Sequence, residues 1–397
     1  MAKDAGTTAP QAGQKEESSS LQAVADASAS EESTFHPYRI TLPTFRRLLS
    51  CYLTTVEQVR RRKAMLKLQP KPAKGSKRTA EKKAGSAFAN PRGAMLLQKT
   101  EFDPSEEKYI KEETENFLTL DEWRYEKMPG IVARRREKGE SEFLTKEELI
   151  TVMDWKMKHG VYRPTLMGMI KANQNKTVLS CASAALAALP TKVDPILAPN
   201  EAFPKPSIDA FGPVRGVGPA TASLILSIAT AKGNPSEEVP FYSDDVYLWL
   251  CLKDFPEPER KGEETVSKFR KPNGELNVRY TIAEYRKLWE ASWELHERLN
   301  RDMDAESQSK SRISHCDIEK VAYVLSNIGV SGFFASQASE DILQMEAQAD
   351  TLDETAARED KLVVKKQTKT EKEEKRAKQT EETTVNRGRN AKRRKIA

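Results

Sequence analysis

The stretch VRGVGPATASLILSIA, from Val214 to Ala229, contains the residues best suited to hold a charged ligand. Gly216 and Gly218 can adopt backbone angles closed to other residues, and neither places a side chain between the backbone and a ligand. Pro219 stands where the following apolar spacing predicts the first turn of a helix, and its missing N–H costs nothing there. Because the amides of this turn lie at the positive end of a helix dipole, the sequence predicts an anion site suited to a phosphate.

We expect the amides of Val217, Gly218 and Ala220 to face the phosphate. Two other interpretations of this stretch remain open. The first is a tight turn between packed helices that binds no ligand, because such a turn has the same sequence. A dinucleotide-binding turn is a weaker interpretation, because no strand precedes the glycines and a third glycine is missing.

A second polar cluster, Ser243-Asp244-Asp245, interrupts the apolar stretch VPFYSDDVYLWL from Val239 to Leu250. Serine is a favoured N-cap, and carboxylates in a first turn complement the helix dipole. The cluster is therefore typical of a helix start.

A basic and aromatic cluster surrounds an expected helix end at Gly160. Its members are Trp155, Lys156, Lys158, His159, Tyr162 and Arg163. Basic side chains in such a cluster can contact phosphates, and an aromatic ring can stack on a base. A solvated helix end with a core tryptophan explains the same residues equally well.

The remaining aromatic and histidine residues indicate structure rather than chemistry. Trp289 and Trp293 are four apart on an expected helix, so both should lie in the core. His36, His296 and His315 have no partners at the spacing of metal ligands or of a nucleophile and its base. We therefore expect no metal site and no cofactor.

Composition limits what this chain can be. Its 397 residues are 38% hydrophobic and 31% charged, which predicts one globular domain with long unpacked segments. The net charge is only +6, so any nucleic-acid footprint should be local. The four cysteines have no short spacing, which favours a reducing compartment over a disulfide framework. With no secretory signal and no apolar run of membrane-spanning length, we expect a soluble, intracellular protein with no membrane contact.

The expected organisation places a helical core between polar ends. Residues 1–34 should be disordered, 35–69 should form an N-terminal helix, and 70–102 should be a basic linker. Residues 103–335 form the expected core, with the paired helices at 206–231, and 336–397 a disordered charged tail. The sequence does not establish whether the N-terminal helix packs on the core.

Within the core the expected fold class is all-α. Helices are predicted at 118–138, 144–160, 163–173, 178–189, 243–252, 281–300 and 314–329. The dipeptide Asn273-Gly274 predicts one small β-hairpin. No alternation of strands and helices predicts a parallel sheet.

GVGPATA, from Gly216 to Ala222, resembles the helix-hairpin-helix motif of the endonuclease-III-like DNA glycosylase superfamily. The resemblance implies a helical glycosylase-like fold whose hairpin holds the DNA backbone through main-chain amides, with Thr221 inside the motif. The chain from about Leu118 to Leu252 is also similar to a eukaryotic group of uncharacterised proteins that share this hairpin. That narrower similarity covers roughly a third of the chain and implies no activity.

The resemblance also bears on catalysis. The position of the lysine nucleophile in bifunctional members is Ala220 here, so the Schiff-base lyase reaction lacks its expected residue. Alignment on the following apolar pair puts Ser243 at the position of the usual aspartate, and a shift of one residue would restore Asp244. An oxocarbenium-like sugar needs a nearby carboxylate, which Asp244 or Asp245 could supply. The four-cysteine cluster of many members is missing.

The C-terminal sequence favours a nuclear location. KRAKQTEETTVNRGRNAKRRK, from Lys375 to Lys395, has the two basic clusters of a bipartite import signal. The sequence thus favours a nuclear, non-catalytic protein that binds the DNA backbone and recruits protein partners through its tails. The alternatives are a monofunctional glycosylase using Asp244 or Asp245, and a helical protein-interaction module with a vestigial hairpin.

Overall fold

The structure, a computed structural model, describes residues 35–70, 99–140, 143–256, 268–271, 275–301 and 312–334. Nearly all of these residues belong to one compact unit that ends at Phe333. The expected disordered ends, the import signal and most of the basic linker lie outside the described residues.

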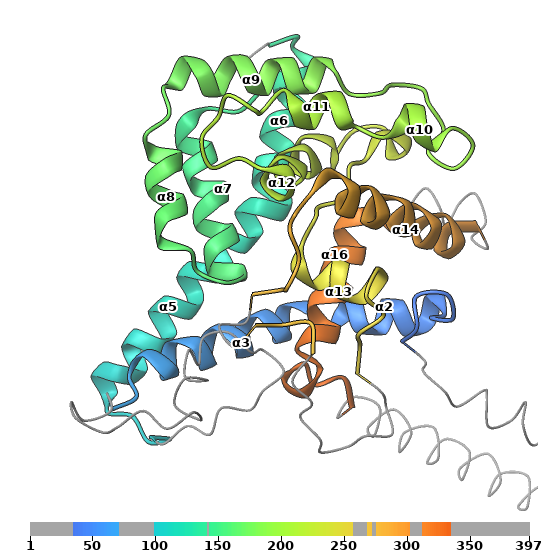
Figure 1. The fold of residues 1–397 in the computed structure, drawn as a ribbon. Helices are drawn as coiled ribbons and strands as arrows, with labels where there is room; N and C mark the ends of the chain where they lie inside the picture. Colours follow the sequence, from blue (N-terminus) through green and yellow to red (C-terminus); the bar gives the residue numbers. More distant parts are fainter. Residues whose placement is uncertain are drawn as a thin grey trace, which may run out of the picture. The chain divides into compact units, whose positions relative to one another are not determined.

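The described residues confirm the all-α class (Figure 1). The elements are α2 (Leu42–Ser50), α3 (Tyr52–Lys67), α5 (Pro104–Glu122), the π-helical turn η1 (Trp123–Lys127), α6 (Met128–Glu137), α7 (Lys146–His159), α8 (Pro164–Lys171), α9 (Asn175–Ala187), α10 (Pro199–Ala202), α11 (Lys205–Asp209), α12 (Pro219–Thr230), η2 (Pro235–Glu237), α13 (Asp244–Leu250), α14 (Ile282–Arg301), α16 (His315–Ser326) and η3 (Ile328–Val330). None of these helices is long and apolar enough to cross a bilayer. Around the expected β-hairpin, Arg270 and Leu276 form an isolated antiparallel bridge, while Asn273 and Gly274 lie outside the described residues.

Local signals set several helix ends. Thr145 and Glu148 form the capping box that starts α7, and the helix ends at Gly160 as expected. The helix expected over 42–68 is divided in two at Cys51, where α2 ends and α3 begins.

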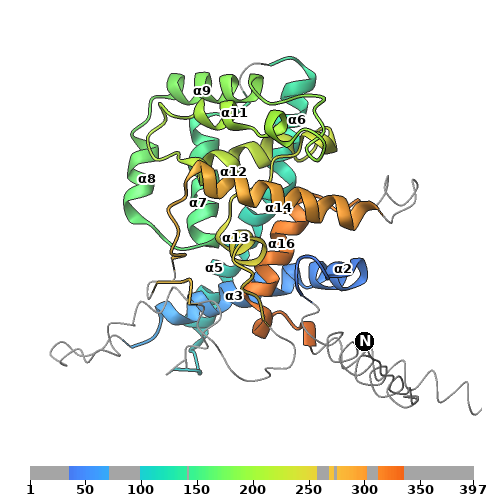
Figure 2. The same cartoon turned by 45° about the vertical axis from the view of Figure 1, so that its right-hand side comes forward.

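Helix α12 is the central element of the fold (Figure 2). Its residues from Thr221 to Thr230 are all buried, and it contacts α6, α9, α11 and α14. The sequence assigned it one apolar face, but serine, threonine and alanine on the other face are small enough for neighbouring helices to cover that face too.

The N-terminal helices pack on the core. Helix α3 contacts both α5 and α16, and the Tyr52 hydroxyl donates hydrogen bonds of 3.1 Å to both carboxylate oxygens of Asp121 in α5. Asp121 also accepts a 2.8 Å hydrogen bond from the Trp155 indole. Residues 35–70 are therefore part of the folded unit, which answers the question that the sequence left open.

A buried ion pair crosses the centre of the fold. The π-helical turn η1 directs Arg124 inward, where its side chain is 0% exposed and its Nη2 lies 2.8 Å from Oε2 of Glu319 on α16. The same guanidinium donates to Ser227 of α12, and the Tyr125 hydroxyl donates to the other oxygen of Glu319. This network joins η1, α12 and α16.

Candidate functional site

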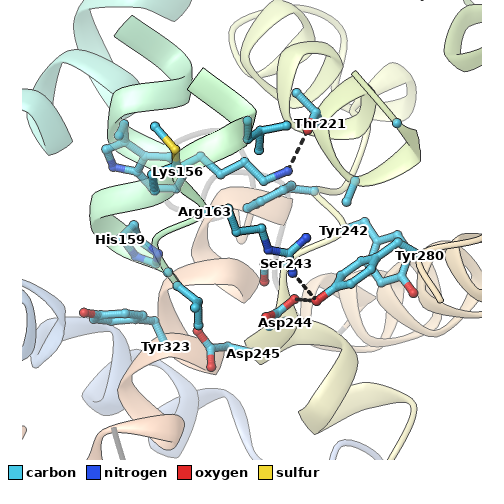
Figure 3. A pocket seen from close by; sticks show the side chains of 18 of the residues that line it. Lys156, His159, Arg163, Thr221, Tyr242, Ser243, Asp244, Asp245, Tyr280 and Tyr323 are labelled. Carbon is cyan, nitrogen blue, oxygen red and sulfur yellow. Dashed lines mark hydrogen bonds between the residues drawn. The ribbon is translucent and has the colours of Figure 1, made fainter. Parts of the chain in front are cut away.

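A pocket of about 500 Å³ opens where several parts of the fold meet (Figure 3). Its walls come from α3, the C-terminal half of α7, the glycine hairpin before α12 and the segment leading into α13, with further side chains from α8, from the segment before α14, and from α16 and η3. A volume of this size is typical of small-ligand sites. The two stretches that the sequence singled out, around Gly216 and Asp244, therefore face one common cavity.

The hairpin has the backbone that its glycines predicted. Gly216 has a φ of +85°, and a Cβ there would lie 3.3 Å from side-chain atoms of Leu166, Met169 and Ile170 in α8. Both the left-handed conformation and the close approach of α8 therefore require glycine. Gly218 is extended, with φ −102°, and a Cβ there would meet no atom within 4 Å.

Asn173 fixes the start of the hairpin. Its side-chain amide donates to the carbonyl of Arg215, and its Oδ1 accepts from the amide of Arg215, each at 2.9 Å. This contact could not be predicted from local sequence, because the two residues are 42 positions apart.

The hairpin amides divide into two groups. The amide of Val217, expected to face a phosphate, instead donates to the carbonyl of Val214 at 3.1 Å, because the turn closes on itself there. The amides of Gly216, Gly218 and Ala220 have no internal hydrogen-bond partner among the described residues. These three remain able to bind an anion at the start of α12.

The expected basic cluster is only partly assembled in the pocket. Lys156 and Arg163 line the pocket, whereas Lys158 does not and instead forms an ion pair with Asp154 at 2.8 Å. Trp155 borders the pocket but is fully buried, which confirms the alternative of a core tryptophan, and Tyr162 is exposed outside the pocket.

Lys156 is the least ordinary charged group of the site. Its Nζ donates a 2.8 Å hydrogen bond to Thr221 Oγ1 and lies 5.7 Å from the centre of the Phe241 ring. Burial lowers the pKa of Lys156 to about 7, although the carboxylate of Asp244 opposes that change. A substantial fraction of this lysine is therefore a neutral amine at physiological pH.

The two carboxylates of the site differ in environment. Ser243 caps α13, since its Oγ accepts from the Val246 amide, and this confirms the expected helix start. Asp245 forms a 2.8 Å ion pair with Arg270, which neutralises it. Asp244 accepts a 2.9 Å hydrogen bond from the Tyr280 hydroxyl, and that hydroxyl accepts a 3.2 Å bond from Arg163. Asp244 is therefore held in position by the neutral Tyr280 hydroxyl, whereas Asp245 is held by the cation of Arg270.

Helix α3 adds a basic wall that the sequence did not assign to the site. The ammonium group of Lys63 donates to the carbonyls of Lys158 and His159 at 3.2 and 3.1 Å, at the C-terminal end of α7. A cation at this position is stabilised by the helix dipole. Burial nevertheless lowers the pKa of Lys63 to about 7.

The charged lining of the pocket is mainly basic. Its basic side chains are Arg62, Lys63, Lys156, Arg163 and Arg270, and its acidic ones are Asp244 and Asp245. Even with both lysines partly neutral, this lining favours an anionic ligand.

Comparison of the chain with models of protein families, with curated protein sequences and with solved structures found no match. The function therefore has to be inferred from the site alone.

Proposed function

We propose that this chain is a nuclear protein of glycosylase-like helix-hairpin-helix architecture that binds the DNA backbone through Gly216–Thr221. The proposal rests mainly on the unpaired amides of Gly216, Gly218 and Ala220, which stand at a helix start on the wall of a basic pocket. A phosphate would accept from these amides, and Lys156 and Arg163 would add positive charge. Such contacts hold the backbone without distinguishing base sequence. The nuclear location rests on the basic clusters from Lys375 to Lys395.

Gly218→Val tests this proposal. A valine at this extended position is compatible with the backbone and meets no neighbour, so the fold should be retained. Its side chain would instead cover the hairpin amides. Because a hydrogen bond to a charged partner contributes about 1.5–3 kcal/mol, we expect the affinity for duplex DNA to fall about tenfold or more. The measurement is fluorescence anisotropy of a labelled duplex, intact or with an abasic site, at several salt concentrations.

Gly168→Val is the matched control. Gly168 is an exposed glycine of α8 that also has room for a side chain, and it does not line the pocket. Comparing full-length chains keeps the basic linker and tail the same in all samples. A full-length variant in which lysines 71–83 and the basic residues of 375–395 are replaced by glutamine then isolates the hairpin. Equal DNA binding by that variant with and without Gly218→Val would remove the support for a DNA-binding hairpin.

A monofunctional DNA glycosylase is the second candidate, and the position of Asp244 favours it. The carboxylate lies in the pocket on a hydrogen bond from Tyr280, without the ion pair that neutralises Asp245. It could stabilise the positive charge that develops on a sugar as its base departs. Incubation with duplexes carrying damaged bases should then release a base, and Asp244→Asn should abolish the release while Asp154→Asn on the surface of α7 does not. Release that survives Asp244→Asn would exclude this role.

A further inference from the structure

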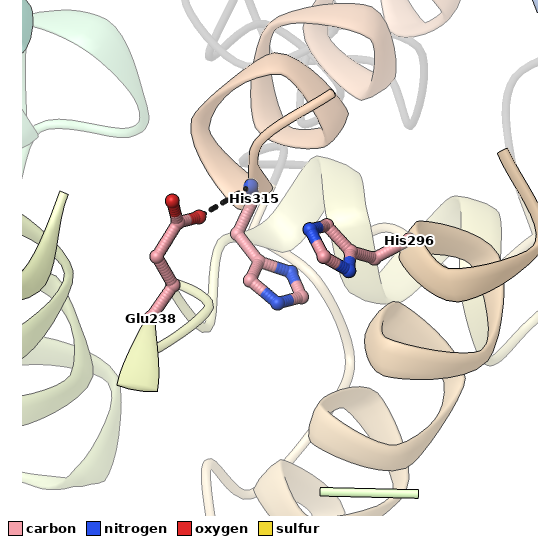
Figure 4. A group of neighbouring side chains, drawn as sticks. All are labelled: Glu238, His296 and His315. Carbon is pink, nitrogen blue, oxygen red and sulfur yellow. Dashed lines mark hydrogen bonds between the residues drawn. The ribbon is translucent and has the colours of Figure 1, made fainter. Parts of the chain in front are cut away.

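Three potential metal ligands from distant parts of the chain meet away from the pocket (Figure 4). They are Glu238 after η2, His296 in α14 and His315 at the start of α16, and one ligand atom of each lies within 4.8 Å of the others. Both histidines are buried and Glu238 is partly buried. No role could be assigned to these histidines from local spacing, because Glu238 and His296 are 58 positions apart and the two histidines are 19 positions apart.

The imidazole nitrogens lack the partners that buried polar atoms normally have. In the described part of the chain, neither Nδ1 nor Nε2 of His296 has a hydrogen-bond partner, and Nε2 of His315 has none. His296 is 0% exposed, so water at the surface cannot satisfy it. A buried polar atom without a partner costs about 1–3 kcal/mol, so these nitrogens require another explanation.

The chemistry of the three groups suits a zinc ion. Two neutral imidazoles and a carboxylate are a known ligand set for Zn²⁺, with a water molecule as the fourth ligand. Both rings lie in the core with at least one ring nitrogen that has no hydrogen-bond partner among the described residues, so each can offer a lone pair to a metal ion. The guanidinium of Arg312 is close enough to oppose a cation, and the carboxylate of Asp317, close to Glu238, offsets it.

The three ligand atoms lie farther apart than the ligand atoms of a tetrahedral zinc site, but only slightly. Zinc–nitrogen bonds of about 2.0–2.1 Å in a tetrahedron place ligand atoms about 3.3 Å apart, so the present atoms would approach by about 1.5 Å at most. The Nδ1 atom of His315 forms a 2.9 Å hydrogen bond with Ser292 Oγ, which orients the ring. A histidine that binds a metal usually makes such a bond through the ring nitrogen that does not coordinate the ion. The His296 and His315 rings stack with their centroids 4.7 Å apart, and among the described residues neither ring nitrogen of His296 has a hydrogen-bond partner, so coordination would break no hydrogen bond of this ring.

We propose that Glu238, His296 and His315 bind a zinc ion that joins the segment before α13 to α14 and α16. The ion would replace the missing partners of the imidazoles and cross-link three parts of the core. This site is separate from the DNA-binding pocket, so the two proposals can fail independently.

Zinc uptake by the full chain tests the proposal. The protein is purified without a polyhistidine tag, treated with a chelator and titrated with zinc sulfate by isothermal calorimetry. We expect one zinc per chain, an increase in the melting temperature, and an X-ray absorption spectrum with nitrogen and oxygen ligands at about 2.0–2.1 Å and no sulfur. Absence of uptake at micromolar zinc would overturn the proposal, as would sulfur ligands at about 2.3 Å, which would place the ion on cysteines.

Variants locate the ion. Glu238→Gln and His296→Asn should each weaken binding at least tenfold, whereas His36→Asn, at a histidine outside the cluster, should leave it unchanged. Glu238→Gln keeps the shape of a partly buried side chain, so it remains informative if His296→Asn fails to fold. Unchanged zinc affinity in Glu238→Gln would rule out the carboxylate as a ligand and overturn the site as proposed.

Discussion

Replacing Arg124 with methionine is expected to lower the free energy of unfolding by about 3–5 kcal/mol. The side chain is fully buried against Glu319, whose side chain is only 3% exposed. Removing the guanidinium leaves a carboxylate in the core to which, among the described residues, only the Tyr125 hydroxyl donates a side-chain hydrogen bond. The measurement is urea denaturation at neutral pH.

Two further variants separate the ion pair from general damage to the core. Arg134→Met, at an exposed position on α6, should change the unfolding free energy by no more than about 0.5 kcal/mol. Adding Glu319→Gln to Arg124→Met removes the uncompensated charge and keeps an acceptor for Tyr125, so it should recover much of the lost stability. An Arg124→Met protein that loses less than about 1 kcal/mol would contradict a buried ion pair at this position.

The wild-type protein is expected to become more stable as the pH rises from 7 to 9.5, and Lys156→Met should remove much of that increase. The pKa of Lys156 is about 7 in the folded chain, against an ordinary value of 10.5. Between these values the unfolded chain binds more protons than the folded chain, so the unfolding free energy rises with pH, by up to about 1.4 kcal/mol per unit. Since Lys156 is only partly buried and the pocket admits water, we expect about 2–3 kcal/mol in total from this residue.

Lys158→Met is the matched control for this pH dependence. Lys158 lies one helical half-turn from Lys156, with its side chain 42% exposed in an ion pair on the surface. Its replacement should leave the slope of stability against pH unchanged, whereas Lys63→Met should reduce the slope as Lys156→Met does. Urea denaturation at half-unit steps of pH gives all four slopes. The same slope in wild type and Lys156→Met would show that this lysine is not perturbed in the folded chain.

The parts of the fold that could be predicted from the sequence depend on near neighbours in the chain. The capping box of Thr145 and Glu148, the serine cap of α13 and the glycine turn before α12 are each encoded within a few residues. These signals placed the hairpin and Asp244 on the expected elements. Because backbone preferences act locally, they also predicted the all-α class.

The parts that could not be predicted depend on contacts between distant segments. Arg124 and Glu319 are 195 positions apart, and no charge pattern in the sequence links them. For the same reason, the sequence could not show that Lys63 lines the pocket or that the Tyr280 hydroxyl donates to Asp244. Local sequence also made Trp155 and Lys158 equal candidates with Lys156, although packing buries the first and turns the second away from the pocket.

The position of α3 has a consequence for shortened forms of this protein. A chain without residues 35–70 would lose the side of the cavity that contains Arg62 and Lys63, together with the buried side chains that α2 and α3 contribute to the core. The carbonyls of Lys158 and His159 would lose their cationic donor, and the aromatic side chain of Phe117 would lose its cover by Arg60. Such a shortened chain would therefore differ from the full chain in the ligands it admits as well as in its stability.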